Sequence, residues 1–225
     1  MNTVLELQQS LGELLGDARL TVTELPGTSL KLWLIDGQNM DRAFSPDETR
    51  RILYEPPYWA FCWASGLALA RYLAEQPHWV KDKRVLDFGA GSGVAGIAAA
   101  KAGALEVVVC DLDPLALAAC RANAALNDVQ LGYSHDFFAE TDRFDLILVA
   151  DVLYDRENLP LLDKFLTRGQ HALVADSRVK DFKHPLYQQL GMLEALTLPD
   201  LAEPHAFRHV SLYHAQRAPC VFQPT

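Results

Sequence analysis

The sequence predicts an α/β fold with a doubly wound, mostly parallel sheet, and three observations support this. From Arg84 onward, short apolar segments alternate with segments that carry helix-forming residues. The run LILVA (146–150) contains no polar residue, as is typical of a central strand that is covered on both faces. The stretch VLDFGAGSGVAGIAAAKAGA (85–104) changes from a strand-like run to an alanine-rich helix through a glycine-dense turn.

Residues 1–55 are expected to form a small N-terminal accessory segment. Residues 1–20 carry neither the basic start nor the continuous apolar core of a signal peptide, and they predict an amphipathic helix. A strand is expected at about residues 30–35, closed by an Asp-Gly turn. In SPDETRRIL (45–53), a Ser is followed by Pro and, three residues after the Ser, by Glu. This pattern predicts a helix that begins with a capping box.

Residues 56–225 are expected to form the main domain. A Pro-Pro pair forces an extended loop before a helix that begins near Ser65. Further helices are expected at 93–103, 114–127 and 157–169, with a short helix near 184–191. Strands are expected at 84–88, 106–111, 129–134, 144–151, 171–176, 193–199 and 207–215. The last two strands are less purely apolar than the others, which is consistent with an antiparallel hairpin.

Composition and charge argue against several classes of protein. The formal net charge is −9 and no apolar run is long enough to cross a membrane, so neither a membrane span nor a nucleic-acid partner is expected. The four cysteines form no CxxC pair, which together with the missing signal-peptide pattern indicates the cytoplasm. No metal is expected, because His209 and His214 would face opposite sides of one strand. The oligomeric state stays open.

The glycine turn is the strongest indication of a ligand site. Gly91 to Gly96 match GxGxxG, and Asp111 follows at the distance expected of a dinucleotide-binding fold, so NAD is one candidate ligand. Close packing of a helix on a strand is the alternative explanation of the glycines. Asp87 ends the preceding strand, where its charge would oppose a pyrophosphate and favour the ammonium and sulfonium of S-adenosylmethionine. Asp111 would accept hydrogen bonds from both ribose hydroxyls.

Four stretches carry a resemblance to a known family: PPYWAFCWASGLALARYL (56–73), VLDFGAGSGVAGIAAAKAGA (85–104), VVCDLDPLALAACRANAALN (108–127) and LVADVLYD (148–155). They resemble the class I S-adenosylmethionine-dependent methyltransferases and, more narrowly, the electron transfer flavoprotein β-subunit lysine methyltransferases. The resemblance implies a Rossmann-like seven-stranded methyltransferase sheet with an antiparallel last strand and helices on both faces. It also implies S-adenosylmethionine as cofactor and a protein lysine as methyl acceptor.

The resemblance further implies a set of cofactor-binding residues. These are Trp63, Asp87, Gly89, Ala90, Gly91, Asp111, Leu112, Asp136, Phe137 and Ala150. Asp87 and the glycines would form the loop on the methionine side, and Asp136 with Phe137 would lie beside the adenine. Trp63 would lie against the cofactor, and its alternative role is that of a buried aromatic anchor.

Two further residues are expected to be catalytic. Asp151 follows an apolar strand at the edge where open sheets bind ligands, and it could accept a hydrogen bond from a lysine ammonium. Tyr154 could add a hydroxyl or an aromatic wall that favours cations. The alternatives are that Asp151 caps the helix that follows it and that Tyr154 packs in the core.

The leading hypothesis for function is therefore methyl transfer from S-adenosylmethionine to lysine side chains of a protein. A methyltransferase of a ribosomal protein or of a small-molecule amine is the nearest alternative. An NAD-linked oxidoreductase and a non-catalytic cofactor-binding module are alternatives of other classes.

Overall fold

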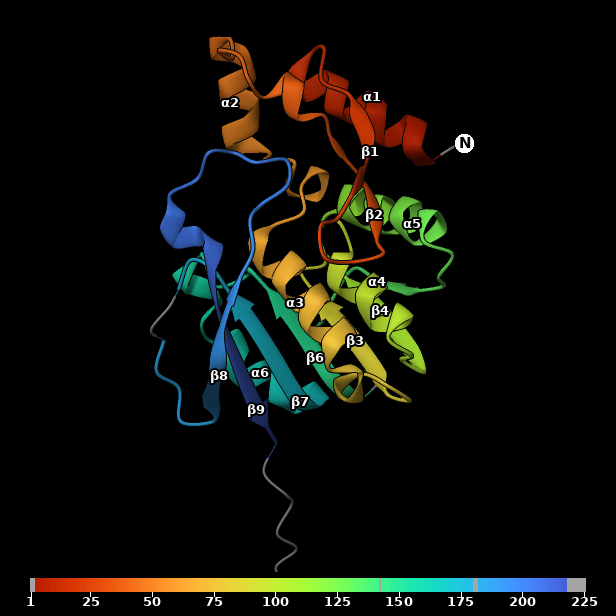
Figure 1. Cartoon of the computed structure of the whole chain (residues 1–225), viewed down its shortest axis with the longest axis vertical. Coiled ribbons are helices and arrows are strands. Elements are labelled where there is room, and N and C mark those ends of the chain that lie inside the picture. Colours follow the sequence, from red (N-terminus) through yellow and green to blue (C-terminus); the bar gives the residue numbers. More distant parts are fainter. Residues whose placement is uncertain (1–2, 142, 180–181, 218–225) are drawn as a thin grey trace, which may run out of the picture.

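The structure is a computed structural model that describes residues 3–141, 143–179 and 182–217, and it is built around a seven-stranded sheet (Figure 1). The strands run across the sheet in the order β5 (Gly132–Ser134), β4 (Glu106–Cys110), β3 (Arg84–Phe88), β6 (Phe144–Ala150), β7 (Gly169–Asp176), β9 (His209–Gln216) and β8 (Tyr187–Glu194). Adjacent strands from β5 to β7 are parallel, whereas β9 is antiparallel to both of its neighbours. The predicted fold class, including its antiparallel last strand, is confirmed.

Helices cover both faces of the sheet because alternate strand residues point to opposite sides. On one face, Val85 and Leu146 pack into a buried cluster with residues of α3 (Ala64–Glu75) and α4 (Val94–Lys101). α5 (Pro114–Leu126) lies on the same face, against β4. On the other face, Leu86 and Ile147 pack with residues of α6 (Leu161–Arg168), so the central strands are buried on both sides.

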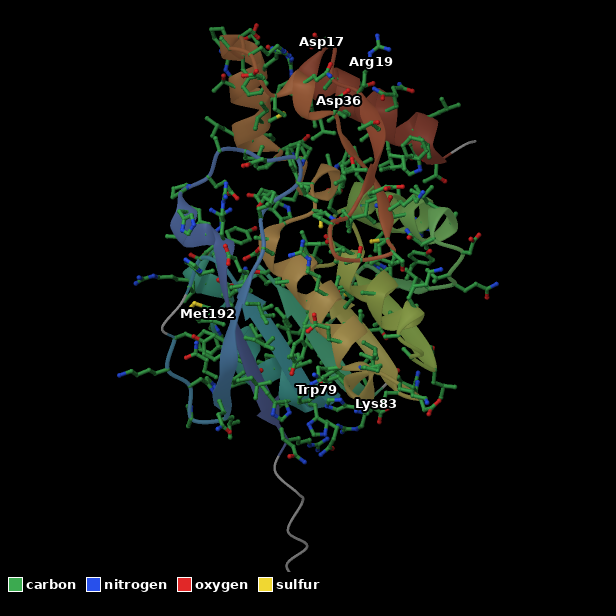
Figure 2. The ribbon with its side chains drawn as sticks, in the orientation of Figure 1. Asp17, Arg19, Asp36, Trp79, Lys83 and Met192 are labelled. Carbon is green, nitrogen blue, oxygen red and sulfur yellow. The ribbon has the colours of Figure 1, made fainter. Side chains whose placement is uncertain are left out.

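The N-terminal segment forms two helices and a hairpin beside the carboxyl edge of the sheet. These are α1 (Thr3–Leu15), β1 (Leu20–Glu24), β2 (Lys31–Ile35) and α2 (Pro46–Tyr54). α1 packs on α5, and β2 contacts α5 as well. Asp17, Arg19 and Asp36 of this segment lie at the end of the molecule opposite to Trp79 and Lys83, which precede β3 (Figure 2).

Most expected elements are present, with ends shifted by a few residues. The helix expected from Ser45 is α2, and its capping box is confirmed: Ser45 accepts from the Glu48 backbone N–H while Glu48 accepts from that of Ser45. β1 was not expected, because its sequence LTVTE has no continuous apolar face and no residue of it is fully buried. It pairs with β2 only.

Near the C-terminal end the strand expected at 207–215 and its antiparallel pairing are confirmed, but two other predictions were wrong. The short helix expected near 184–191 is instead most of the edge strand β8, and the strand expected at 193–199 ends at Glu194. Five consecutive residues of β8 are solvent-exposed, so the strand has no alternation from which to recognise it; pairing with β9 decides its conformation. No helix of the described ranges is long and apolar enough to span a membrane.

Candidate active site at the carboxyl edge of the sheet

The glycine turn joins β3 to α4 and is bound to the end of the neighbouring strand β4. The backbone N–H groups of Gly89 and Ala90 donate to the Cys110 carbonyl at 2.9 and 3.2 Å. Gly89 and Gly91 have φ values of +64° and +53°, which L side chains rarely adopt. A Cβ at Gly89 would also lie 2.8 Å from a methyl group of Val152, so the turn and the segment after β6 touch. Only glycine permits this approach.

Asp87 stands on β3 two residues before Gly89, and its side chain is buried between β3 and α4. Its carboxylate accepts a hydrogen bond of 2.8 Å from the Gly96 backbone N–H, at the start of α4. Burial, with the nearby Asp111 carboxylate as a lesser cause, raises the pKa of Asp87 to about 7. A cation bound at the turn would be attracted to this acidic group, whereas a pyrophosphate would be repelled.

Asp111 and Leu112 follow β4 beside the turn. One oxygen of Asp111 accepts from the Gly91 N–H at 2.9 Å and the other from the Asp113 N–H at 3.0 Å. Burial raises the pKa of Asp111. A carboxylate has about four lone-pair sites, so Asp111 retains acceptor capacity for a ribose hydroxyl. Leu112 is 83% exposed and offers an apolar surface next to that carboxylate.

Asp136 and Phe137 follow β5, the next strand of the sheet. Asp136 accepts a hydrogen bond of 2.8 Å from the Phe138 N–H and so shapes this loop. The Phe137 ring is buried and packs edge-on against Phe88 and Phe165, with centroid distances of 5.1 and 5.7 Å. The ring is therefore part of the core. The expected contact of Phe137 with an adenine would have to come from its backbone atoms.

Asp151 follows Ala150, the half-buried last residue of β6, and it joins three segments through its carboxylate. The carboxylate accepts from the hydroxyl groups of Ser65 and Ser177, each at 2.7 Å, and from their backbone N–H groups at 3.0 and 2.9 Å. Asp151 itself has a φ of +51°. It thereby caps α3, whose N-cap residue Trp63 makes no side-chain cap. The alternative that Asp151 caps the helix that follows is wrong, because Asp155 does so.

An aromatic cluster is formed by Tyr58, Trp63 and Tyr154, the last of which stands three residues after Asp151. Tyr154 is 54% exposed, which contradicts the alternative that it packs in the core. Its ring lies 5.9 Å from that of Tyr58, which in turn lies 5.8 Å from the Trp63 ring, and the Trp63 indole N–H donates to the Tyr58 carbonyl at 3.0 Å. Partial burial, with Tyr58 close by, raises the pKa of Tyr154 to about 12, so the phenol stays neutral.

Sequence reasoning missed four residues of the site: Tyr58, Ser65, Asp176 and Ser177. Asp176 is fully buried at the end of β7 and accepts backbone hydrogen bonds from Leu153, Arg178 and Val179. Burial raises the pKa of Asp176 to about 6, with the Asp151 charge as a lesser cause. Tyr58 and Ser65 stand in the stretch 56–73 that carries the family resemblance, and Asp176 ends an expected strand, so the sequence holds a signal for these three residues.

The connection between β8 and β9 lies against the same site. Its Leu198 exchanges two backbone hydrogen bonds with Cys62, just before α3. Arg178 pairs with Glu203 of the connection, and its guanidinium lies 4.0 Å from the Phe207 ring centroid and 5.9 Å from that of Trp63. Figure 1 shows the connection running up towards α2.

The arrangement fits S-adenosylmethionine on two observations. The space over the turn is open, since a Cβ at Gly91 would have the Tyr58 carbonyl oxygen, at 4.0 Å, as its nearest neighbour. Asp111, which is half-buried, and Tyr58, whose ring contacts those of Trp63 and Tyr154, lie next to the turn, a combination suited to a ligand with positive charge. Among the described residues, no three His, Cys, Asp or Glu side chains are placed to bind a metal ion.

Known proteins with similar sequences are methyltransferases. Residues 60–175, more than half of the chain, match the family described as lysine methyltransferase. The electron transfer flavoprotein beta subunit lysine methyltransferases of Mus musculus and Xenopus laevis are 36% and 38% identical over 156 and 159 residues, or 65% of this chain. The match spans only 61% and 63% of those relatives. A ribosomal protein L11 methyltransferase of Shewanella sediminis is 44% identical over 98 residues, 41% of this chain and 33% of that protein.

Solved structures agree on the fold. The 16S rRNA N2 G1207 methyltransferase of T. thermophilus, in complex with AdoMet and guanosine, superposes with a TM-score of 0.54 at 17% identity, covering 89% of this chain and 51% of that one. A putative RNA methyltransferase from Pyrococcus horikoshii gives 0.51 at 17% identity over 68% of this chain and 83% of that one. Because the matched residues 60–175 contain the glycine turn, Asp111 and Asp151, the chain belongs to the lysine methyltransferase family.

Proposed function

We propose that the protein transfers methyl groups from S-adenosylmethionine to lysine side chains of a protein. One observation carries the proposal: the family match over residues 60–175 contains the glycine turn, Asp111 and the stretch from Asp151 to Tyr154, all at one edge of the sheet. The catalytic and cofactor-binding roles of the individual residues are part of this proposal.

S-adenosylmethionine supplies a methyl group already activated by its sulfonium, so the protein has mainly to hold and align the reactants. In our proposal the turn from Gly89 to Gly91 lets the backbone approach the methionine part, and Asp111 binds the ribose. Leu112 and Asp136 border the adenine. Trp63 and Tyr58 close the site on the side of α3, where their rings are held by contacts with each other.

The acceptor lysine has to lose a proton before it can attack, because its ordinary pKa is about 10.4. Tyr154 would provide an aromatic face for the incoming ammonium and partly exclude water, which favours the neutral amine. Asp151 would orient the nitrogen. Two of its four hydrogen bonds come from serine hydroxyls, which can rotate away and free a lone pair of the carboxylate.

The β subunit of electron transfer flavoprotein is the proposed acceptor. The relatives whose matches cover 65% of this chain are named as lysine methyltransferases of that subunit. The chain spans about three fifths of those relatives, so substrate identity is inferred from the shared part alone.

We further propose that the protein acts in the cytoplasm. Its described cysteines, Cys62, Cys110 and Cys120, are buried free thiols, as is usual in a reducing compartment.

Two measurements test the proposed function. Isothermal titration of the purified protein is expected to show binding of S-adenosylhomocysteine and no binding of NAD. Labelled methyl groups from S-adenosylmethionine are then expected on lysines of purified electron transfer flavoprotein β subunit, as located by mass spectrometry. Ribosomal protein L11 serves as the competing acceptor. Methylation of L11 alone would overturn the acceptor, and binding of NAD alone would overturn the reaction class.

A further inference from the structure

Asn123 on α5 connects the N-terminal hairpin to the glycine turn. Its side chain is fully buried, and both ends of its amide are used. The oxygen accepts a hydrogen bond of 2.7 Å from the Trp33 backbone N–H of β2. The nitrogen donates a hydrogen bond of 2.9 Å to the carbonyl of Ser92. One side chain therefore holds two segments that lie far apart in the sequence.

Ser92 stands in the middle of the glycine turn. Its neighbours Gly91 and Gly93 have φ values of +53° and +80°, so they restrain the peptide groups around it less than other residues would. On one side of Ser92 the Gly91 N–H binds the Asp111 carboxylate, and on the other side α4 begins. The bond from Asn123 to the Ser92 carbonyl therefore fixes the peptide orientation where the turn is most permissive.

We infer that Asn123 is a positioning residue through which the N-terminal hairpin fixes the cofactor-binding turn. The inference rests on the proposed function, because it takes this turn to be the S-adenosylmethionine site. It assigns the N-terminal segment a part in cofactor binding, beyond covering the fold. Asn123 does not touch the reacting atoms; it acts by holding the Ser92 carbonyl, and hence the Gly91 N–H that faces Asp111.

Asn127 is a matched control, because it lies one helical turn after Asn123, at the C-cap of α5, and binds the same strand. Its side chain accepts from the Lys31 N–H at 3.0 Å and donates to the Lys31 carbonyl at 2.6 Å and to the Asn123 carbonyl at 2.7 Å. It makes no hydrogen bond with the turn. Replacing Asn127 therefore disturbs the contact between α5 and the hairpin while the bond to Ser92 is kept.

The test compares Asn123→Ala, Asn123→Asp and Asn127→Ala in the full chain. Asn123→Asp keeps an oxygen that can accept from Trp33 but loses the donor to Ser92. Both Asn123 variants are expected to bind S-adenosylhomocysteine about tenfold more weakly, as expected for the loss of a hydrogen bond worth about 1.4 kcal/mol. Asn127→Ala is expected to bind within twofold of wild type, although its melting temperature falls as well. In turnover, KM for S-adenosylmethionine is expected to rise while KM for the acceptor stays unchanged.

Hydrogen exchange of the amides of residues 89–94 provides a readout that needs no ligand. Faster exchange there in both Asn123 variants, with wild-type exchange in Asn127→Ala, supports the positioning of the turn by Asn123, even if the turn proves not to bind S-adenosylmethionine. Equal effects of Asn123→Ala and Asn127→Ala on affinity and exchange would overturn it, since the hairpin would then only stabilise the fold. Unchanged exchange in Asn123→Asp would overturn it too.

Discussion

At the scale of single residues, Asp151 combines a structural and a proposed chemical task. Its carboxylate holds the first turn of α3 and the end of β7 together, through Ser65 and Ser177. Asp151 also stands three residues before Tyr154, one of the aromatic residues where the acceptor lysine is proposed to enter. Asp151→Asn keeps the shape of the side chain, removes its charge and leaves one acceptor oxygen for these bonds.

We expect Asp151→Asn to lower kcat about 100-fold, in the range that proton-transfer and orienting groups contribute. Asn tolerates the left-handed backbone of this position, but its NH2 group cannot accept from the Ser65 backbone N–H, so the melting temperature should fall as well. Titration with S-adenosylhomocysteine should give a Kd within threefold of wild type. Asp155→Asn is the control, because Asp155 only caps the short helix after it. Loss of cofactor binding in Asp151→Asn would make Asp151 a cofactor or folding residue.

Asp87 makes the stability of the protein depend on pH. Burial raises its pKa from 3.8 to about 7, so between these pH values the folded protein holds a proton that the unfolded chain has lost. Raising the pH through this window therefore favours unfolding, and the free energy of unfolding should fall between pH 4 and 7. Asp176, whose pKa burial raises to about 6, acts in the same direction.

Asp87→Asn is expected to flatten this dependence while it keeps an oxygen for the Gly96 N–H. Urea unfolding at several pH values on both sides of this window measures the effect. The variant should gain stability relative to wild type as the pH rises. An identical pH dependence in the two proteins would mean that Asp87 titrates near its ordinary pKa in the folded state.

At the scale of elements, the crossing of α3 and α4 depends on a glycine. A Cβ at Gly66 would lie 2.6 Å from a Val94 methyl group, a distance that real Cβ atoms do not reach. Gly66→Ala should therefore lower the free energy of unfolding by about 1–3 kcal/mol. Gly12→Ala on α1 is the opposite case, because no atom lies within 4 Å of a Cβ at Gly12. This variant should raise the free energy of unfolding by up to about 1 kcal/mol. Chemical denaturation of both variants compares the signs of the two changes in the free energy of unfolding.

The connection between β8 and β9 is the element most suited to discriminate acceptors. Arg178 anchors it beside Trp63 through Glu203, and both side chains are mostly buried. We expect Glu203→Gln to raise KM for the acceptor protein about tenfold, because the freed connection no longer borders the site, an effect of about 1.4 kcal/mol. Binding of S-adenosylhomocysteine should not change. Arg208→Gln removes a more exposed ion pair with Asp200 in the same connection and should leave both quantities unaltered.

At the scale of the whole molecule, the N-terminal segment shares its core with the main domain. Leu11 of α1 is fully buried in one cluster with Ala119 of α5 and Trp59. The division of the chain at residues 55 and 56 stays a prediction about sequence organisation. Packing indicates that the two parts fold as one cooperative unit.

Leu11→Ala is expected to lower the free energy of unfolding by about 2–5 kcal/mol, the range for replacing buried leucines by alanine. If the two parts form one unit, calorimetry should show a single unfolding transition that moves to lower temperature as a whole. Leu5→Ala is the control, since Leu5 lies on the same helix but is 63% exposed. Two separate transitions in the variant would show that the N-terminal segment unfolds independently.

Much of this fold could be predicted from the sequence because its signals are local. The capping box at Ser45, the apolar run of β6 and the glycine turn each depend on residues that are neighbours in the chain. β1 and β8 could not be predicted in the same way. Their residues are largely exposed, and pairing with β2 and β9 decides their conformation.

The sequence by itself determined the alternation of strands and helices from Arg84 to Asp176, the place of the glycine turn and the acidic strand ends Asp87, Asp111 and Asp151. The spacing of apolar residues, the turn residues and the family resemblance are all local features of the sequence. Only the tertiary structure decided that Asp151 binds Ser65 and Ser177, or that Asn123 joins Trp33 to Ser92. These bonds link residues 26 to 90 positions apart. The packing of helices on the sheet brings such groups together, and no local pattern encodes that packing.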